Sequence, residues 1–325
     1  MNKKSETREL FTLEGSECII RGTHHKVRDV SYCAQLDIVE RDRIGVLFLN
    51  SLSPTRAGKG DSAVYWADSF AEGGYPSFRF DLPGFGDSDG DPPADQLNFI
   101  NHGCYAPIVC TKIRELVARF NLSGVVLVGL CAGAVSAIHT AAACRECRGV
   151  ILMDPYFHLP LSPRSSVWGK LVGRIPAGAL RRVLKRCFHI LLAARVQMPT
   201  AKLPSNSNFG LLRHYKELAS RCLPTLILTV PAVRQRGVGF DYINYICEQA
   251  RNNQMVLQVV SGADHTFANR IGRTSVRRFI EVWLNDYFPL QGRSEDVVSA
   301  EKSECGSAKS RIQSVQRYLH EESLS

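Results

Sequence analysis

The fold is decided by the stretch Val126-Leu127-Val128-Gly129-Leu130-Cys131-Ala132-Gly133-Ala134. Its apolar start predicts a buried strand, and the small residues that follow predict a helix over 132–143. A side chain on the sharp turn between them is held in a strained backbone conformation, so Gly-x-Cys-x-Gly supplies small neighbours. The turn lifts the Cys131 thiol above the sheet, and the N–H of Ala132 and the helix N-terminus face the same space. The motif alone leaves open a buried, unreactive cysteine in a tight turn.

Outward from this stretch, apolar runs alternate with helical patterns, which is typical of a mostly parallel sheet with helices on both faces. The expected parallel strands are Ile44–Asn50, Pro76–Asp81, Val125–Gly129, Gly149–Asp154, Thr225–Val230 and Met255–Val260. Leading strands are expected at Leu10–Leu13, Glu17–Ile20 and Ala34–Val39. The expected helices are Ser62–Glu72, His102–Phe120, Ala132–Ala143, Asp241–Asn252 and Thr274–Tyr287. We therefore predict an α/β fold.

The composition is that of a globular protein, with 45% hydrophobic and 22% charged residues among 325. No apolar run approaches the roughly 18 residues that span a membrane, and no apolar segment follows the basic start. The eleven cysteines suggest no disulfide framework, so we expect free thiols in the reducing cytoplasm. No metal-ligand spacing stands out, because the Cys144–Cys147 pair lacks a second pair, and we expect no metal and no cofactor.

The net charge of +9 is concentrated in one segment. Residues 155–222 contain twelve Lys and Arg against the single acid Glu217, so this segment carries +11 and the rest of the chain −2. Its centre, 177–196, has the pattern of a basic amphipathic helix. Nucleic acid is not an expected partner, because the basic residues match no binding motif. Residues 291–325 read as a charged tail, flexible or weakly helical.

Two further stretches suggest residues of a catalytic site. A Gly/Pro-rich loop over 81–88 follows one strand, and Asp264-His265-Thr266 follows the last strand. A histidine after the final strand can reach over the sheet edge to a nucleophile on the central strand, which gives the Cys131 turn a partner.

The stretches that carry a family resemblance are Leu49-Asn50, Arg79-Phe80-Asp81-Leu82, Gly84-Phe85-Gly86-Asp87-Ser88, Gly129-Leu130-Cys131-Ala132-Gly133-Ala134, Val167-Trp168-Gly169-Lys170-Leu171 and Ala263-Asp264-His265-Thr266-Phe267. Through them the chain resembles an α/β-hydrolase over roughly residues 30–288. It is similar in particular to the bacterial hydrolase-like proteins encoded with exopolysaccharide and exosortase systems.

The resemblance implies a role for each matching residue. Cys131 would be the nucleophile that forms a thioester, and His265 would take the thiol proton and return it to the leaving group. The oxyanion would lie between the N–H of Ala132 and a backbone N–H just after Asn50, at Ser51 or Leu52.

The third catalytic residue departs from the family pattern. The loop after strand Thr225–Val230, where the family places an acid, holds Arg or Gly at the expected position. Asp241 is the nearest carboxylate and our first choice, although it stands where a helix N-cap is expected. Asp154, at the end of the preceding strand, is the alternative acid. A Cys–His pair without any acid remains a third option, because a thiol is more acidic than a hydroxyl.

By the same resemblance, residues 155–222 occupy the position of a helical, substrate-covering cap inserted before the penultimate strand, and residues 1–154 with 223–290 form the hydrolase core. The basic charge favours an anionic acyl donor on a phosphopantetheine carrier, on coenzyme A or in a lipid. Alternatively, the basic helix expected at 177–196 is simply solvated and its charge has no role in binding. A further alternative is weak peripheral contact of this helix with a membrane. Arg56, after the expected oxyanion loop, is a candidate for binding a substrate carboxylate.

We therefore expect a cytoplasmic α/β-hydrolase that acts on an acyl ester or thioester through Cys131 and His265. Hydrolysis, as by a thioesterase or esterase, is favoured over acyl transfer because water is always at hand and no acceptor site can be read. The rival hypothesis is a catalytically silent binding protein on this fold, because the expected acid is missing.

Overall fold

The computed structural model describes residues 7–14, 18–27, 43–49, 52, 55–160, 203–231, 240–249 and 254–290. Within them, eight strands form one sheet in the order β1-β2-β4-β3-β5-β6-β7-β8. The strands are β1 Arg8–Leu13, β2 Ile20–His25, β3 Ile44–Leu49, β4 Ser77–Phe80, β5 Gly124–Leu130, β6 Cys147–Met153, β7 Thr225–Thr229 and β8 Met255–Val259. β1, β2 and β4 pair antiparallel, and every later neighbouring pair is parallel. The expected mostly parallel sheet is confirmed.

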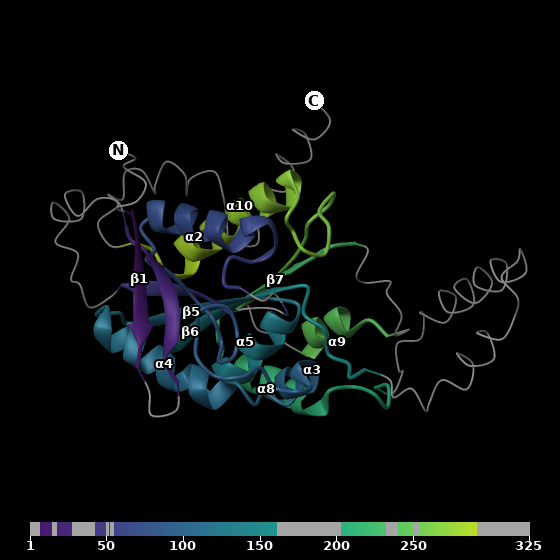
Figure 1. Cartoon of the computed structure of the whole chain (residues 1–325). Coiled ribbons are helices and arrows are strands. Elements are labelled where there is room, and N and C mark those ends of the chain that lie inside the picture. The colour runs from purple at the N-terminus through teal and green to yellow at the C-terminus, as the bar shows by residue number, and fades with distance from the viewer. Residues whose placement is uncertain are drawn as a thin grey trace, which may run out of the picture.

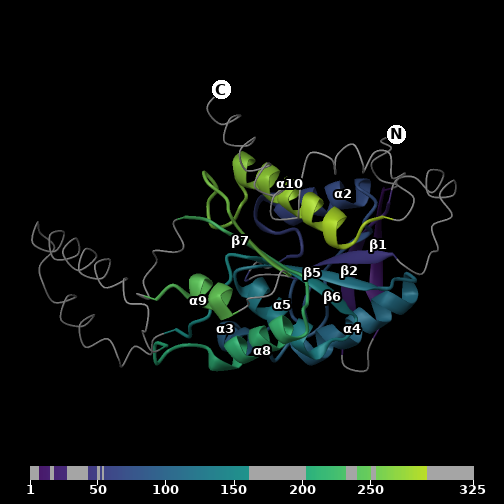
Figure 2. The same ribbon diagram turned by 180° about the vertical axis from the view of Figure 1, so that it is seen from behind.

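Helices cover both faces of the sheet (Figures 1 and 2). They are the 3₁₀ turn η3 Lys59–Asp61, and α2 Ser62–Glu72, α3 Gln96–Asn101, α4 Ala106–Arg119, α5 Ala132–Ala143, α8 Phe209–Ser220, α9 Tyr242–Gln249 and α10 Arg270–Tyr287. α2 and α10 lie together on one face, while α3, α4, α5, α8 and α9 lie on the other.

The central strands are apolar throughout because both of their faces are covered. Val126 and Val128 of β5 point toward the α2 and α10 side, where they join one core cluster with Trp283. The alternate residue Leu127 points to the opposite side and packs in the cluster that includes α5 and α8. The sheet is thereby held in place from both sides, and its strand ends form a fixed edge.

Helix α8 changes the expected domain boundary. It lies within residues 155–222, which we assigned to the cap, yet its Leu211, Tyr215 and Leu218 are buried in the same core cluster as α5. The side chain of Asn208 caps its start by accepting a hydrogen bond from the N–H of Leu211 at 3.0 Å. This helix belongs to the core because its apolar residues recur at helical spacing on one face, although its other face is basic.

The leading strand expected at Glu17–Ile20 is wrong in its bounds, because β2 runs from Ile20 to His25. α2 and α5 have the predicted bounds, whereas α3 was not predicted, and α4 begins after Gly103 because its φ of 71° ends the preceding helix. The expected strand at 34–39, the helix at 177–196 and the tail from 291 lie outside the described residues.

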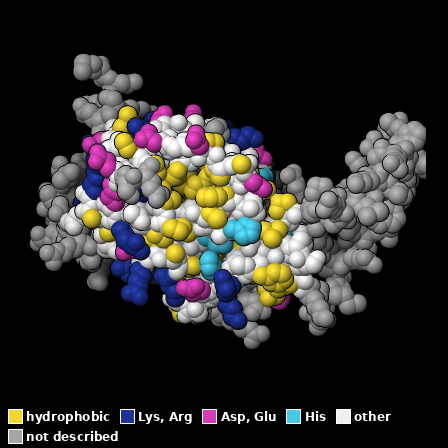
Figure 3. Space-filling view, turned by 60° about the horizontal axis from the view of Figure 1, so that its bottom comes forward, with side chains coloured by type: hydrophobic (Ala, Val, Ile, Leu, Met, Phe, Trp, Pro, Cys, Tyr) yellow, Lys and Arg dark blue, Asp and Glu magenta, His cyan; other side chains and the backbone are white. Residues whose placement is uncertain are grey.

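The face over the α5 layer is shown in Figure 3, where histidines gather near the middle beside hydrophobic side chains. His139 of α5 donates through Nε2 to the carbonyl of Asn101, and its Nδ1 lies 2.8 Å from Nδ1 of His214 on α8. Burial lowers the pKa of His139 to about 4, so its Nδ1 accepts a hydrogen bond from His214. The pair ties α8 to the helix that follows Cys131.

None of the helices in the described ranges combines the length and the apolar character that crossing a bilayer requires.

Candidate active site

The candidate catalytic residues come together at the carboxyl ends of adjacent parallel strands. Cys131 follows β5, Asp154 follows β6 and His265 lies in the loop after β8. Open α/β sheets bind ligands at this edge, because loops from neighbouring strands converge there.

Cys131 occupies a strained turn. Its φ of 53° and ψ of −111° lie outside the regions that ordinary residues adopt, and it immediately precedes α5. A Cβ on Gly129 would lie 2.2 Å from the carbonyl oxygen of Gly133, so the strand and the helix approach too closely for any side chain there. The Cys131 N–H donates to the carbonyl of Met153 at 2.8 Å, which joins the turn to β6. The expected strand–turn–helix geometry of the Gly-x-Cys-x-Gly motif is therefore present.

Asp154 anchors the histidine. Its Oδ2 lies 2.8 Å from Nδ1 of His265, and its Oδ1 accepts a hydrogen bond from the N–H of Val230 at 3.0 Å. The Asp154 side chain is fully buried, whereas 33% of the His265 side chain is exposed. A φ of 45° at Asp154 turns the chain so that the carboxylate can reach both partners.

His265 lies between this carboxylate and the candidate nucleophile. Its pKa is raised to about 10, first by the hydrogen bond to Asp154 and next by a hydrogen bond to Cys131, while burial opposes the shift. Because Nδ1 bonds to Asp154, Nε2 is the ring nitrogen that faces the sulfur. The imidazole is therefore protonated at neutral pH and presents a positive charge to the Cys131 sulfur.

Asp241, our first choice of acid, has a different role. Its Oδ1 accepts a hydrogen bond from the N–H of Asn244 at 3.0 Å, which makes Asp241 the cap of α9. The carboxylate bonded to His265 is that of Asp154, so the preference for Asp241 is corrected. Asp154 directly follows β6, the strand adjacent to that of Cys131, whereas Asp241 stands just before α9.

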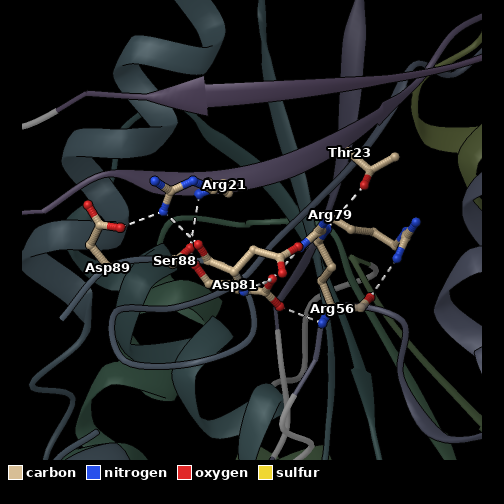
Figure 4. Close-up of polar contacts among 8 residues, drawn as sticks. Arg21, Thr23, Arg56, Arg79, Asp81, Ser88 and Asp89 are labelled. Atoms are coloured by element: carbon tan, nitrogen blue, oxygen red, sulfur yellow. Dashed lines mark hydrogen bonds and ion pairs between the residues drawn. The ribbon is translucent and has the colours of Figure 1, made fainter. Parts of the chain in front are cut away.

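Arg56 lines the cavity beside Cys131, and its guanidinium is held by other protein groups. Its Nη1 forms ion pairs with the fully buried Asp81 and with Asp87, and its Nε donates to Thr23 at 3.1 Å. Its carbonyl oxygen accepts a hydrogen bond from Arg79 at 2.9 Å, so the loop after β3 is tied to β4 (Figure 4). These contacts give Arg56 a structural role, because the charge of Asp81 must be compensated in the interior, and its binding of a substrate carboxylate stays a prediction.

The expected oxyanion donors are only partly described. Ala132 is fully buried at the first position of α5, directly after Cys131. Leu52 has a side chain that is 47% exposed, and Ser51 lies outside the described residues.

A cavity of about 390 Å³ opens beside Cys131 and His265 and extends under α2. Trp66 of α2 and Val230, the N–H partner of Asp154, are site residues that sequence reasoning missed. Both look like ordinary apolar core positions, and nothing in their local pattern marks them. No group of three or more His, Cys, Asp or Glu suited to a metal ion occurs in the part of the chain that is described.

Comparison with known proteins agrees with this fold. No curated protein matches the sequence significantly. Among solved structures, an esterase from Pyrococcus furiosus, Pf2001, superimposes with a TM-score of 0.56 at 14% identity, over 89% of this chain and 95% of that one. The thioesterase domain from the curacin biosynthetic pathway gives 0.51 at 15% identity, over 84% and 98%. An alpha-beta serine hydrolase homologue from Coxiella burnetii gives 0.51 at 16%, over 84% and 95%.

At these identities the likeness to the solved structures concerns the fold. The match to a family model establishes family membership, because it covers residues 46–284, a range that includes Cys131, Asp154 and His265. With its mostly parallel sheet and its strained turn after β5, the chain belongs to the alpha/beta hydrolase family.

Proposed function

We propose that the protein hydrolyses an acyl ester or thioester through a covalent thioester on Cys131, with His265 as the proton carrier and Asp154 as the acid that orients it. The observation that carries this proposal is the chain of contacts from the strained Cys131 through His265 to the buried Asp154. Each link is short-range, and together they match the nucleophile, base and orienting group of a catalytic triad.

In the first step the Cys131 thiolate attacks the acyl carbonyl carbon. The carbonyl oxygen takes up the electron pair and becomes an oxyanion. In the proposal it accepts hydrogen bonds from the N–H of Ala132 and from an N–H of the loop after β3, at Ser51 or Leu52. When the oxyanion collapses, the bond to the leaving group breaks, and protonated His265 donates its Nε2 proton to the departing oxygen or sulfur.

The second step needs His265 to act as a base. Once Cys131 is acylated, its charge is gone, and with it the contributions of Cys131 that raise the pKa of His265. The imidazole can then take a proton from water, whose oxygen attacks the thioester carbon. Collapse of the second oxyanion releases the carboxylic acid, and the sulfur leaves as a thiolate beside the protonated ring.

The sequence and the shared fold favour further features of this reaction. A carrier-linked or coenzyme A donor is favoured by the basic residues of 155–222, and a cytoplasmic location by the many cysteines. An esterase and a thioesterase domain share the fold. The likeness to hydrolases encoded with exopolysaccharide and exosortase systems belongs to the same proposal, and acyl transfer to an acceptor other than water would use the same thioester.

The alternative of a catalytically silent binding protein was motivated by the lack of an acid at the family position. Asp154 removes that motive, because its carboxylate is hydrogen-bonded to His265 at 2.8 Å.

The test is intact-protein mass spectrometry after a short exposure to an acyl thioester and an acid quench. We expect one acyl group on the wild-type protein and none on Cys131→Ala. The matched control is Cys104→Ala, because Cys104 is an exposed thiol that could be acylated without catalysis. An adduct that persists in Cys131→Ala, or its absence from the wild type, would reject the proposal.

A further inference from the structure

The cavity beside the candidate nucleophile is walled mostly by apolar side chains, although Thr55, Arg56, Lys59, Ser62 and Thr266 also belong to its lining. Its lining includes Phe48, Ala63, Trp66, Val128, Leu130 and Met153, with Cys131 and His265 at one end. Phe48, Val128 and Met153 come from three adjacent strands and point to the face that α2 covers. The cavity therefore runs from the sulfur into the layer between the sheet and α2, on the face opposite α5.

We propose that this cavity binds the acyl chain of the substrate, and that the preferred acyl group is a straight saturated chain of about eight to ten carbons. The inference rests on the proposed function, which supplies the thioester at Cys131. A chain attached there has its first carbons at the mouth, and the apolar side chains that form most of the lining favour a hydrocarbon over a polar substituent.

The size of the chain follows from the volume. At roughly 30 Å³ for each water-sized group, a cavity of about 390 Å³ holds on the order of a dozen non-hydrogen atoms. Some of that space lies at the mouth and holds the carbonyl and the leaving group. The remainder accommodates a medium-length chain.

Trp66 limits the cavity on the helix side. It is only 3% exposed, and its Nε1 donates to the carbonyl of Arg273 at 3.0 Å, so the indole cannot rotate out of the way without losing that bond. Ala63 lies one turn earlier on α2 and also lines the cavity. Its small side chain leaves room there that a larger residue would fill.

These positions allow a direct test with p-nitrophenyl esters from acetyl to myristoyl. We expect kcat/KM to rise about fourfold with each added methylene until the cavity is filled, and to fall for longer chains. Ala63→Leu should shift the optimum to a shorter chain, since leucine suits a helix and occupies the cavity. Val64→Leu is the control, because Val64 is the next residue of α2 and does not line the cavity.

An optimum at acetyl in the wild type, or an unchanged optimum in Ala63→Leu, would overturn the acyl-chain proposal. A second measurement separates it from the question of the nucleophile, namely calorimetric binding of decanoate and butyrate to Cys131→Ala. Tighter binding of decanoate, weakened by adding Ala63→Leu, supports the cavity even if the wild type forms no acyl adduct. Equal affinity for the two acids rejects the cavity even if Cys131 is acylated.

Discussion

Replacing Asp154 with asparagine tests the candidate triad with little change in shape. The N–H of Val230 donates to Asp154 Oδ1 at 3.0 Å and would hold the asparagine oxygen in that place. The asparagine NH₂ would then face Nδ1 of His265, where the carboxylate now lies at 2.8 Å. An NH₂ group donates, so Nδ1 must accept, and the single ring proton moves to Nε2. The nitrogen that faces Cys131 can then no longer take up a proton.

The size of the loss follows from the two contributions that Asp154 makes. It orients the ring, and it is the largest cause of the raised pKa of His265. General acid–base catalysis is worth about 10² to 10⁴ in rate. We expect kcat/KM to fall about 10³-fold, which corresponds to about 4 kcal/mol of barrier.

The assay is steady-state release of thiol from an acyl thioester, with the melting temperature measured in parallel. Asp241→Asn is the matched control, because asparagine caps a helix about as well as aspartate. It should keep wild-type activity and nearly wild-type stability. If Asp154→Asn stays within about threefold of the wild type while remaining folded, or if Asp241→Asn is equally impaired, the assignment of Asp154 is wrong.

Two further predictions concern pH and Arg56. Because the folded pKa of His265 is raised to about 10, its contribution to stability is complete below its unfolded value near 6.5 and is lost as pH rises through 10. The ring resonance of His265 in NMR should accordingly titrate near pH 10, and in Asp154→Asn at lower pH; a wild-type midpoint below 7 would contradict this. Arg56→Met leaves the buried carboxylate of Asp81 without its ion pair, so the free energy of unfolding in urea should fall by about 3 kcal/mol. An unchanged KM for an anionic substrate would leave Arg56 with the structural role alone, and a raised KM with unaltered stability would favour the substrate-binding role.

Local patterns in the sequence were sufficient for much of the fold. Apolar runs and helical spacing predicted the parallel strands and the bounds of α2 and α5, because each of these signals lies within a few neighbouring residues. The same is true of the turn at Cys131, since Gly129 must be small for the strand and the helix to cross. α8 was assigned to the cap because the positive charge of residues 155–222 was interpreted as that of one inserted segment.

The partners of side chains that are distant in sequence required the tertiary structure. Asp154 and Asp241 both come after strands in the chain. No local sequence signal indicates which of the two carboxylates bonds to His265. The choice depends on the order of strands in the sheet and on the turn after β6, where a φ of 45° aims the carboxylate. The ion pair of Arg56 was missed for the same reason, because its buried partner Asp81 follows β4, whereas Arg56 lies in the loop after β3. Helices, strands and turns depend on residues that are close in the chain, so their sequence signals are local. Hydrogen-bond partners and cavity walls come from elements that meet only after folding.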